Sequence, residues 1–123
     1  MSVAEVTDNN TPDSSAAAQR FARFNARPEI RRITARYADW AAQGDGCIVN
    51  VQLSGLAMLR LAGRISRHDY RASVRKLAGT SGLPQTDFLL LAECSREMVR
   101  YMLSSSGQIP FTPWEWNAEE GEM

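Results

Sequence analysis

Apolar residues recur every three or four positions through most of this chain, the spacing that places side chains on one face of an α-helix. The first run follows a polar, acidic start. Residues 1–13 contain too little apolar surface to offset the entropy of ordering, so we expect them to be disordered. Asp13 or Ser14 is a suitable N-cap, and the alanine-rich stretch that follows predicts a first helix to about Ala26.

A second helix is predicted after Pro28, because proline is well tolerated at the first position of a helix. The pattern predicts one continuous helix up to a stop at Gly44-Asp45-Gly46. Its apolar side would carry Ile30, Ile33, Tyr37 and Trp40.

The segment from Cys47 to Ser54 fits two structures, because apolar and polar residues alternate in it as in a half-buried strand. We favour a helix that continues to a stop at Gly63, since no second strand pattern offers a partner for a lone strand. If the segment is a strand, pairing with its copy across a dimer axis would satisfy its backbone.

Two more helices are predicted after Gly63. Ser66-Arg67-His68-Asp69 is a variant capping box that opens a helix ending at Gly79, with arginines outward. After a loop at 80–85, a long helix should run from about Thr86 to Ser105. Its predicted core stripe comprises Phe88, Leu91, Ala92, Ser95, Met98, Val99 and Met102. Its predicted solvated face comprises Glu93, Arg96, Glu97 and Arg100.

These elements together predict an all-α fold: a compact bundle of about five helices in residues 14–106, between a disordered tail (1–13) and an extended aromatic strap (107–123). Leu89 and Leu90 lie off the core stripe of the last helix, so this chain, a second subunit or a partner must cover them. The strap, with Phe111, Trp114 and Trp116, either lies over the helical core or anchors an interface.

The net charge of zero hides a basic body between acidic ends. All fourteen basic residues, thirteen of them Arg, lie between Arg20 and Arg100, and glutamates and aspartates flank that region. Arginine suits interfaces because its planar guanidinium makes bidentate and stacking contacts.

Groups able to carry covalent chemistry are scarce. The one histidine, His68, is expected to be a solvated surface residue, and Cys47 and Cys94 to be reduced thiols. No phosphate-binding loop or metal motif is present, so we expect no catalytic residues, no metal and no cofactor. Neither a secretory signal nor a membrane-spanning segment is visible, and a cytoplasmic protein is expected.

Nucleic-acid binding is the alternative function. Arginines recur at helical spacing and could form one basic ridge, and the last two helices permit a helix-turn-helix interpretation. The first turns of the last helix are acidic and leucine-rich, however, whereas a recognition helix needs polar side chains there. The predicted ridge comprises Arg60, Arg64, Arg67, Arg71 and Arg75.

Protein binding accounts for surplus leucines, methionines and aromatics together, since interfaces are enriched in these residue types. The segments RFARFNARPEIRR (20–32) and DFLLLAECSREMVR (87–100) resemble the small helical quorum-sensing anti-activators of Gram-negative bacteria, of the LasR-specific type. The resemblance covers roughly residues 20–116. It implies a homodimer that binds the ligand-binding domain of a LuxR-type transcription factor and blocks its dimerisation or DNA binding.

A toxin-neutralising or chaperone-like protein would differ from this hypothesis only in its partner. The exposed-apolar argument and the charges, rather than the resemblance, nominate the partner-binding residues. They are Leu89, Leu90, Phe111, Trp114, Trp116, Arg67 and Arg71.

Overall fold

The protein is all-α, as predicted, and the computed structural model describes residues 12–108, with side chains from Ala16 onward. Six helices make up this part of the chain. They are α2 (Pro12–Ala26), α3 (Pro28–Arg36), α4 (Ala38–Ala42), α5 (Gly44–Leu61), α6 (Arg67–Ser81) and α7 (Gln85–Ser105). Residues 12–108 contain no strand, so the helix favoured for 47–54 is confirmed.

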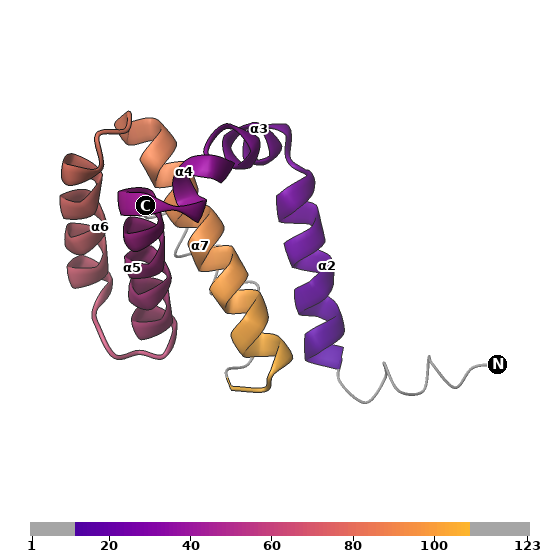
Figure 1. Ribbon diagram of the computed structural model, residues 1–123. Coiled ribbons are helices and arrows are strands. Elements are labelled where there is room, and N and C mark those ends of the chain that lie inside the picture. Colours follow the sequence, from indigo (N-terminus) through magenta and orange to yellow (C-terminus); the bar gives the residue numbers. More distant parts are fainter. Residues whose placement is uncertain (1–11, 109–123) are drawn as a thin grey trace.

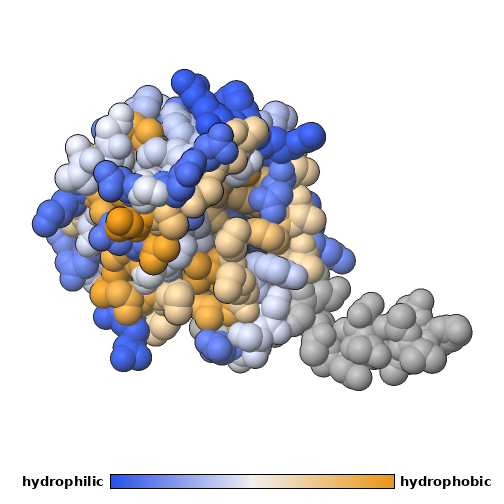
Figure 2. Space-filling model, viewed as in Figure 1, coloured by the Kyte–Doolittle hydropathy of each residue, from blue (hydrophilic) through white to orange (hydrophobic). Residues whose placement is uncertain are grey.

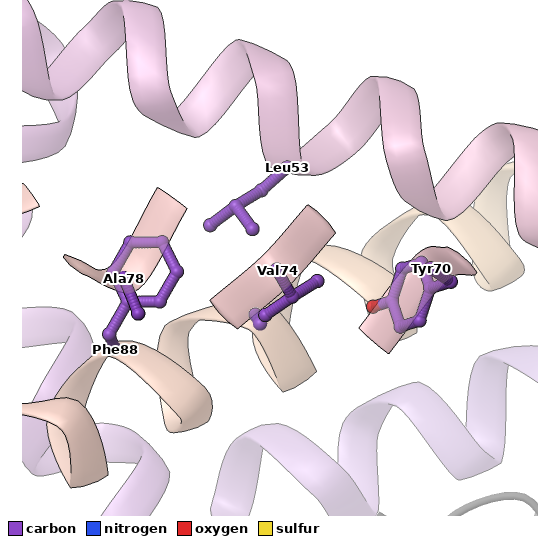
Figure 3. Close-up of a cluster of buried hydrophobic side chains, with 6 residues drawn as sticks. Leu53, Tyr70, Val74, Ala78 and Phe88 are labelled. Atoms are coloured by element: carbon purple, nitrogen blue, oxygen red, sulfur yellow. The ribbon is translucent and has the colours of Figure 1, made fainter. Parts of the chain in front are cut away.

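Helix α7 is the centre of the fold. It contacts α2, α3, α5 and α6. Figure 1 shows α5 and α6 side by side on one side of α7 and α2 on the other. The largest core cluster lies between α5, α6 and α7, where Leu53, Tyr70, Val74 and Phe88 are almost completely buried. Figure 3 shows Leu53 of α5 facing Val74 of α6, with Phe88 of α7 beside Ala78.

The region predicted as one helix after Pro28 is in fact two, because the chain leaves helical geometry at Tyr37 (φ −109°, ψ 16°). Tyr37 is buried, and its hydroxyl donates a hydrogen bond to the Asp87 carboxylate at the start of α7. Together with Ile33 and Leu91, Tyr37 forms a second core cluster, against which Trp40 also packs. The break therefore coincides with the residue that joins α3 to α7.

Glycines mark the helix ends, though not all where the sequence indicated. Gly44, with φ +65°, is the first residue of α5, so the predicted stop at Gly44 is also a helix start. The prediction that α6 ends at Gly79 was wrong: it continues to Ser81, and Gly82 supplies the left-handed C-cap (φ +78°). The start of α6 is confirmed, since the Ser66 hydroxyl accepts a hydrogen bond from the Asp69 amide at 3.0 Å.

The prediction of a solvated polar face on α7 was wrong. Arg96 is 0% exposed, Glu97 2% and Arg100 6%. Helix α2 packs against α7 and reaches Glu97. Arg20 of α2 forms an ion pair with Glu97 at 3.0 Å. At the end of the same contact Phe21 stacks on Tyr101, with ring centroids 4.8 Å apart. Charged and aromatic side chains therefore hold α2 against α7.

The opposite side of α7 corrects the predicted core stripe. Phe88, Leu91, Ala92, Ser95 and Val99 are buried as expected. Met98 and Met102 are instead exposed, since no described helix covers them. The buried surface of α7 therefore extends towards Arg96 and Arg100 rather than towards Met98 and Met102.

Candidate functional site

Helix α5 carries apolar residues on two sides, and only one of them faces the core. Leu53 and Ala57 are buried, whereas four large apolar residues point away from the fold. These are Ile48 (59% exposed), Val51 (64%), Met58 (50%) and Leu59 (43%). Successive members are three, seven and one residues apart, which places all four along one side of the helix. We name these four residues the α5 outer face.

A groove adjoins this face between α5 and α6. Its volume is about 890 Å³, and it is open to solvent along its length. From α5 and the following turn it is lined by Gln52, Gly55, Leu56, Met58, Leu59, Ala62 and Arg64, and from α6 by Ser73, Lys76, Leu77 and Thr80. Apolar side chains dominate the lining, and Arg64 and Lys76 bring positive charge. Figure 2 shows apolar surface on the side of the molecule where α5 and α6 lie. We name this feature the α5–α6 groove.

A second, smaller apolar surface lies on α7. Met98 and Met102 are exposed one turn apart, and Met98 borders a hollow of about 160 Å³ between α3, α4, α5 and α7. Methionine side chains are flexible and polarisable, which suits surfaces that adapt to a partner. Exposed apolar side chains on α5 and on α7 are therefore both available to a binding protein, and α5 residues Asn50 and Ser54 line the same hollow as Met98.

The two leucines predicted to bind a partner, Leu89 and Leu90, differ in their exposure. Leu89 is 36% exposed and remains available, whereas Leu90 is half-buried against the cluster of Ile33, Tyr37 and Leu91. Leu90 is thus covered at least partly by this chain, the first of the alternatives that the sequence left open. Phe111, Trp114 and Trp116 lie outside the described residues, and their assignment stays a prediction.

Sequence reasoning missed the α5 outer face. The signal was present, because the run from Cys47 to Leu61 is more apolar than a helix with one buried side requires. The alternating pattern in its first half was instead weighed as a strand. No single position in the run is unusual, so the surplus is visible only once the helix and its buried side are known.

The predicted arginine ridge is uneven. Arg64 and Arg75 are exposed, whereas Arg67 and Arg71 are half-buried on α6, and the Nε atom of Arg67 is buried. Arg60 is likewise half-buried on α5. A ridge that tracks phosphates needs its guanidinium groups in water, so these side chains offer less to duplex DNA than their spacing suggests.

The helix-turn-helix interpretation meets a second difficulty at the start of α7. Asp87 is engaged by Tyr37, and the neighbouring Leu90 and Leu91 pack against α3. A recognition helix inserts its N-terminal turns into the major groove. In this fold, another helix of the protein already occupies part of that end of α7.

Chemically reactive groups do not converge in the described part of the chain. Residues 12–108 contain no group of three or more His, Cys, Asp and Glu side chains able to hold a metal ion. Cys47 and Cys94 are both free thiols, as predicted, and burial raises the pKa of the Cys94 thiol to about 11. His68 is exposed at the start of α6, as predicted.

Comparison of the chain with protein-family models, curated proteins and solved structures finds no match in any of the three. Among the helices of residues 12–108, none combines the length and apolar character needed to cross a membrane. The resemblance to quorum-sensing anti-activators therefore stays a prediction that rests on the sequence segments alone.

Proposed function

We propose that this chain is a non-enzymatic regulatory protein that binds and sequesters another protein, using the α5 outer face. The single observation that carries the proposal is the exposure of four large apolar side chains on one side of α5. Exposed apolar patches larger than a few hundred Å² are rare on monomeric proteins and mark interaction sites, whereas single exposed apolar residues are common. Four large ones on one side of a single helix favour the first case. Helices that are apolar on all sides are normally buried on all sides.

The energetics of this face fit a specific complex. Full burial of a Val, Leu, Ile or Met side chain contributes about 1.5–3 kcal/mol, so completing the burial of a half-exposed one contributes roughly 1 kcal/mol. Four such residues would supply about 4 kcal/mol, or nearly a thousandfold in affinity at 1.4 kcal/mol per factor of ten. Arg64 and Lys76 beside the groove favour an acidic partner surface and would set its orientation.

For the partner we propose a LuxR-type quorum-sensing transcription factor whose dimerisation or DNA binding is blocked, and for the active form a homodimer in the cytoplasm. The resemblance of residues 20–32 and 87–100 to anti-activators supports this choice. Exposed apolar side chains on both α5 and α7 support a protein that makes more than one binding contact.

The test is co-purification from the native host with full-length tagged protein, after nuclease treatment of the lysate. Wild type should retain a LuxR-type factor in stoichiometric amount, and Val51→Asp should lose it because a charge is placed at the most exposed position of the α5 outer face. Ala35→Asp is the matched control, since it adds the same charge at an exposed position of α3.

A gel-shift assay with the purified factor and its promoter DNA then measures sequestration. Wild type should reduce the protein–DNA complex, and Val51→Asp should not. Retention of the factor by Val51→Asp at the wild-type level would refute the role of the α5 outer face. Recovery of duplex DNA alone, lost on nuclease treatment, would favour the DNA-binding alternative.

A further inference from the structure

The α5–α6 groove combines an apolar lining with two cationic side chains. Leu56, Met58 and Leu59 supply the apolar part from α5, and Arg64 and Lys76 supply the charge. Neither cation forms an ion pair with a carboxylate among residues 16–108. An occupant should therefore present large apolar groups together with several negative charges.

The C-terminal segment of this chain has that composition. Residues 109–123 have the sequence IPFTPWEWNAEEGEM, with three aromatic residues and four glutamates. One glutamate lies between the two tryptophans, and the other three follow them. Aromatic side chains bring more apolar area than any other residue type, and about 150–250 Å² can be buried for each. Pro110 and Pro113 restrict the backbone, so less conformational entropy is lost on binding. The segment carries no Lys or Arg that would oppose Arg64 and Lys76.

The segment can also reach the groove. It follows Gln108, three residues after α7 ends, and α7 packs against both α5 and α6. Fifteen extended residues span up to about 50 Å, whereas a folded domain of about 100 residues has a radius of gyration of roughly 13 Å. A tethered segment acts at an effective concentration on the order of millimolar, so even weak intrinsic affinity suffices for docking.

From this match of composition, charge and reach we propose that residues 109–123 dock in the α5–α6 groove of the same chain. Phe111, Trp114 and Trp116 contact the apolar lining, and the glutamates lie beside Arg64 and Lys76. Met58 and Leu59 belong to both the groove and the α5 outer face, so the docked segment covers half of that face. If the proposed function holds, the segment therefore competes with the partner for Met58 and Leu59 and weakens the apparent affinity for that partner.

Fluorine NMR on the full-length protein with fluorinated tryptophan tests the docking without any partner. The protein has three tryptophans, and Trp114 and Trp116 are assigned by comparison with Trp114→Phe and Trp116→Phe. Docking should move both resonances away from those of a free 109–123 peptide and reduce their solvent isotope shifts. Met58→Asp should return both to the peptide positions.

Met102→Asp is the matched control, because Met102 is exposed (58%, against 50% for Met58) but lies on α7 outside the groove. Circular dichroism verifies that each variant remains helical. Arg64→Glu combined with Lys76→Glu leaves the apolar lining intact, and it should reduce the docked fraction severalfold, as should added salt in the wild type.

Two results would overturn the docking itself: wild-type tryptophan resonances at the free-peptide positions, or resonances unchanged by Met58→Asp in a protein that stays folded. A docked fraction that rises with protein concentration would overturn docking within one chain, because the segment would then be entering the groove of a second copy. The wild-type resonances, the effect of Met58→Asp and the concentration dependence are all measured without any partner protein. Failure of the docking and failure of the proposed function can therefore be distinguished.

Discussion

Replacing Glu97 by Gln should destabilise this protein by about 3 kcal/mol, although the sequence places Glu97 on a face that looks solvated. Glu97 is 2% exposed and pairs with Arg20, whose side chain is 16% exposed, at 3.0 Å. Removing one partner of a buried ion pair costs about 3–5 kcal/mol, because the other charge is left in a poorly solvated place. The lower end applies here, since Arg20 keeps some contact with water. Arg96 and Arg100, also buried within one turn of Glu97, add positive charge that the glutamate offsets.

Urea denaturation followed by circular dichroism measures this change, which is a large part of the 5–15 kcal/mol typical of a domain. The midpoint of thermal unfolding should fall by about 10–15 °C. Arg20→Met and the double variant complete a mutant cycle, and a coupling energy of about 1–3 kcal/mol is expected between the two sites. Glu29→Gln is the control: Glu29 pairs with Arg27 at 2.6 Å on the surface, and its loss should leave the midpoint unchanged. A Glu97→Gln protein within about 0.5 kcal/mol of wild type would refute the reasoning.

Three further predictions follow from the core and the glycines. Phe88→Ala should cost about 3–5 kcal/mol in the same urea assay, because Phe88 is fully buried between α5, α6 and α7. Gly46→Ala should prevent stable folding, since its Cβ would lie 1.9 Å from the Trp40 carbonyl oxygen, whereas Gly55→Ala, with nothing nearby, should stabilise α5 by roughly 0.5–1 kcal/mol. Burial raises the pKa of Cys94 from 9.0 to about 11, so its contribution to stability is present below pH 9 and is lost as the pH rises to about 11. The pH dependence of unfolding should be shallower in Cys94→Ala over that range.

The helical class and most helix positions follow from the sequence, because Pro28, Ser66 and the apolar periodicity are local signals. The two errors on α7 have a non-local cause. Periodicity identifies the polar side of a helix but not what packs against it. Here Glu97 on that side pairs with Arg20 of α2, and the two residues are 77 positions apart in the sequence. A polar helix face can be buried when another helix brings the complementary charge. Nothing within residues 85–105 alone indicates this.

The break at Tyr37 also coincides with a contact to a distant part of the chain. Residues 28–42 carry one continuous helical pattern, and no glycine or proline interrupts it after Pro28. The contact that accompanies the break is the hydrogen bond from the Tyr37 hydroxyl to Asp87, fifty positions along the chain. The periodicity of such a segment can be predicted from local sequence, whereas a contact with a residue fifty positions away cannot.

The strand-like pattern of residues 47–54 and the candidate binding surface have one explanation. Val49 and Leu53 belong to the side of α5 that packs on the core, and Val51 belongs to the outer face. Two apolar stripes on opposite sides of a helix place apolar residues two positions apart along the sequence, which imitates the alternation of a strand. A single-sided amphipathic helix would not produce that pattern. Substituting the outer stripe with polar residues, as in Val51→Asp, should therefore remove the strand-like signal and the proposed binding together while the core stripe keeps α5 folded. Loss of helix content in Val51→Asp would show instead that the outer stripe is needed for folding.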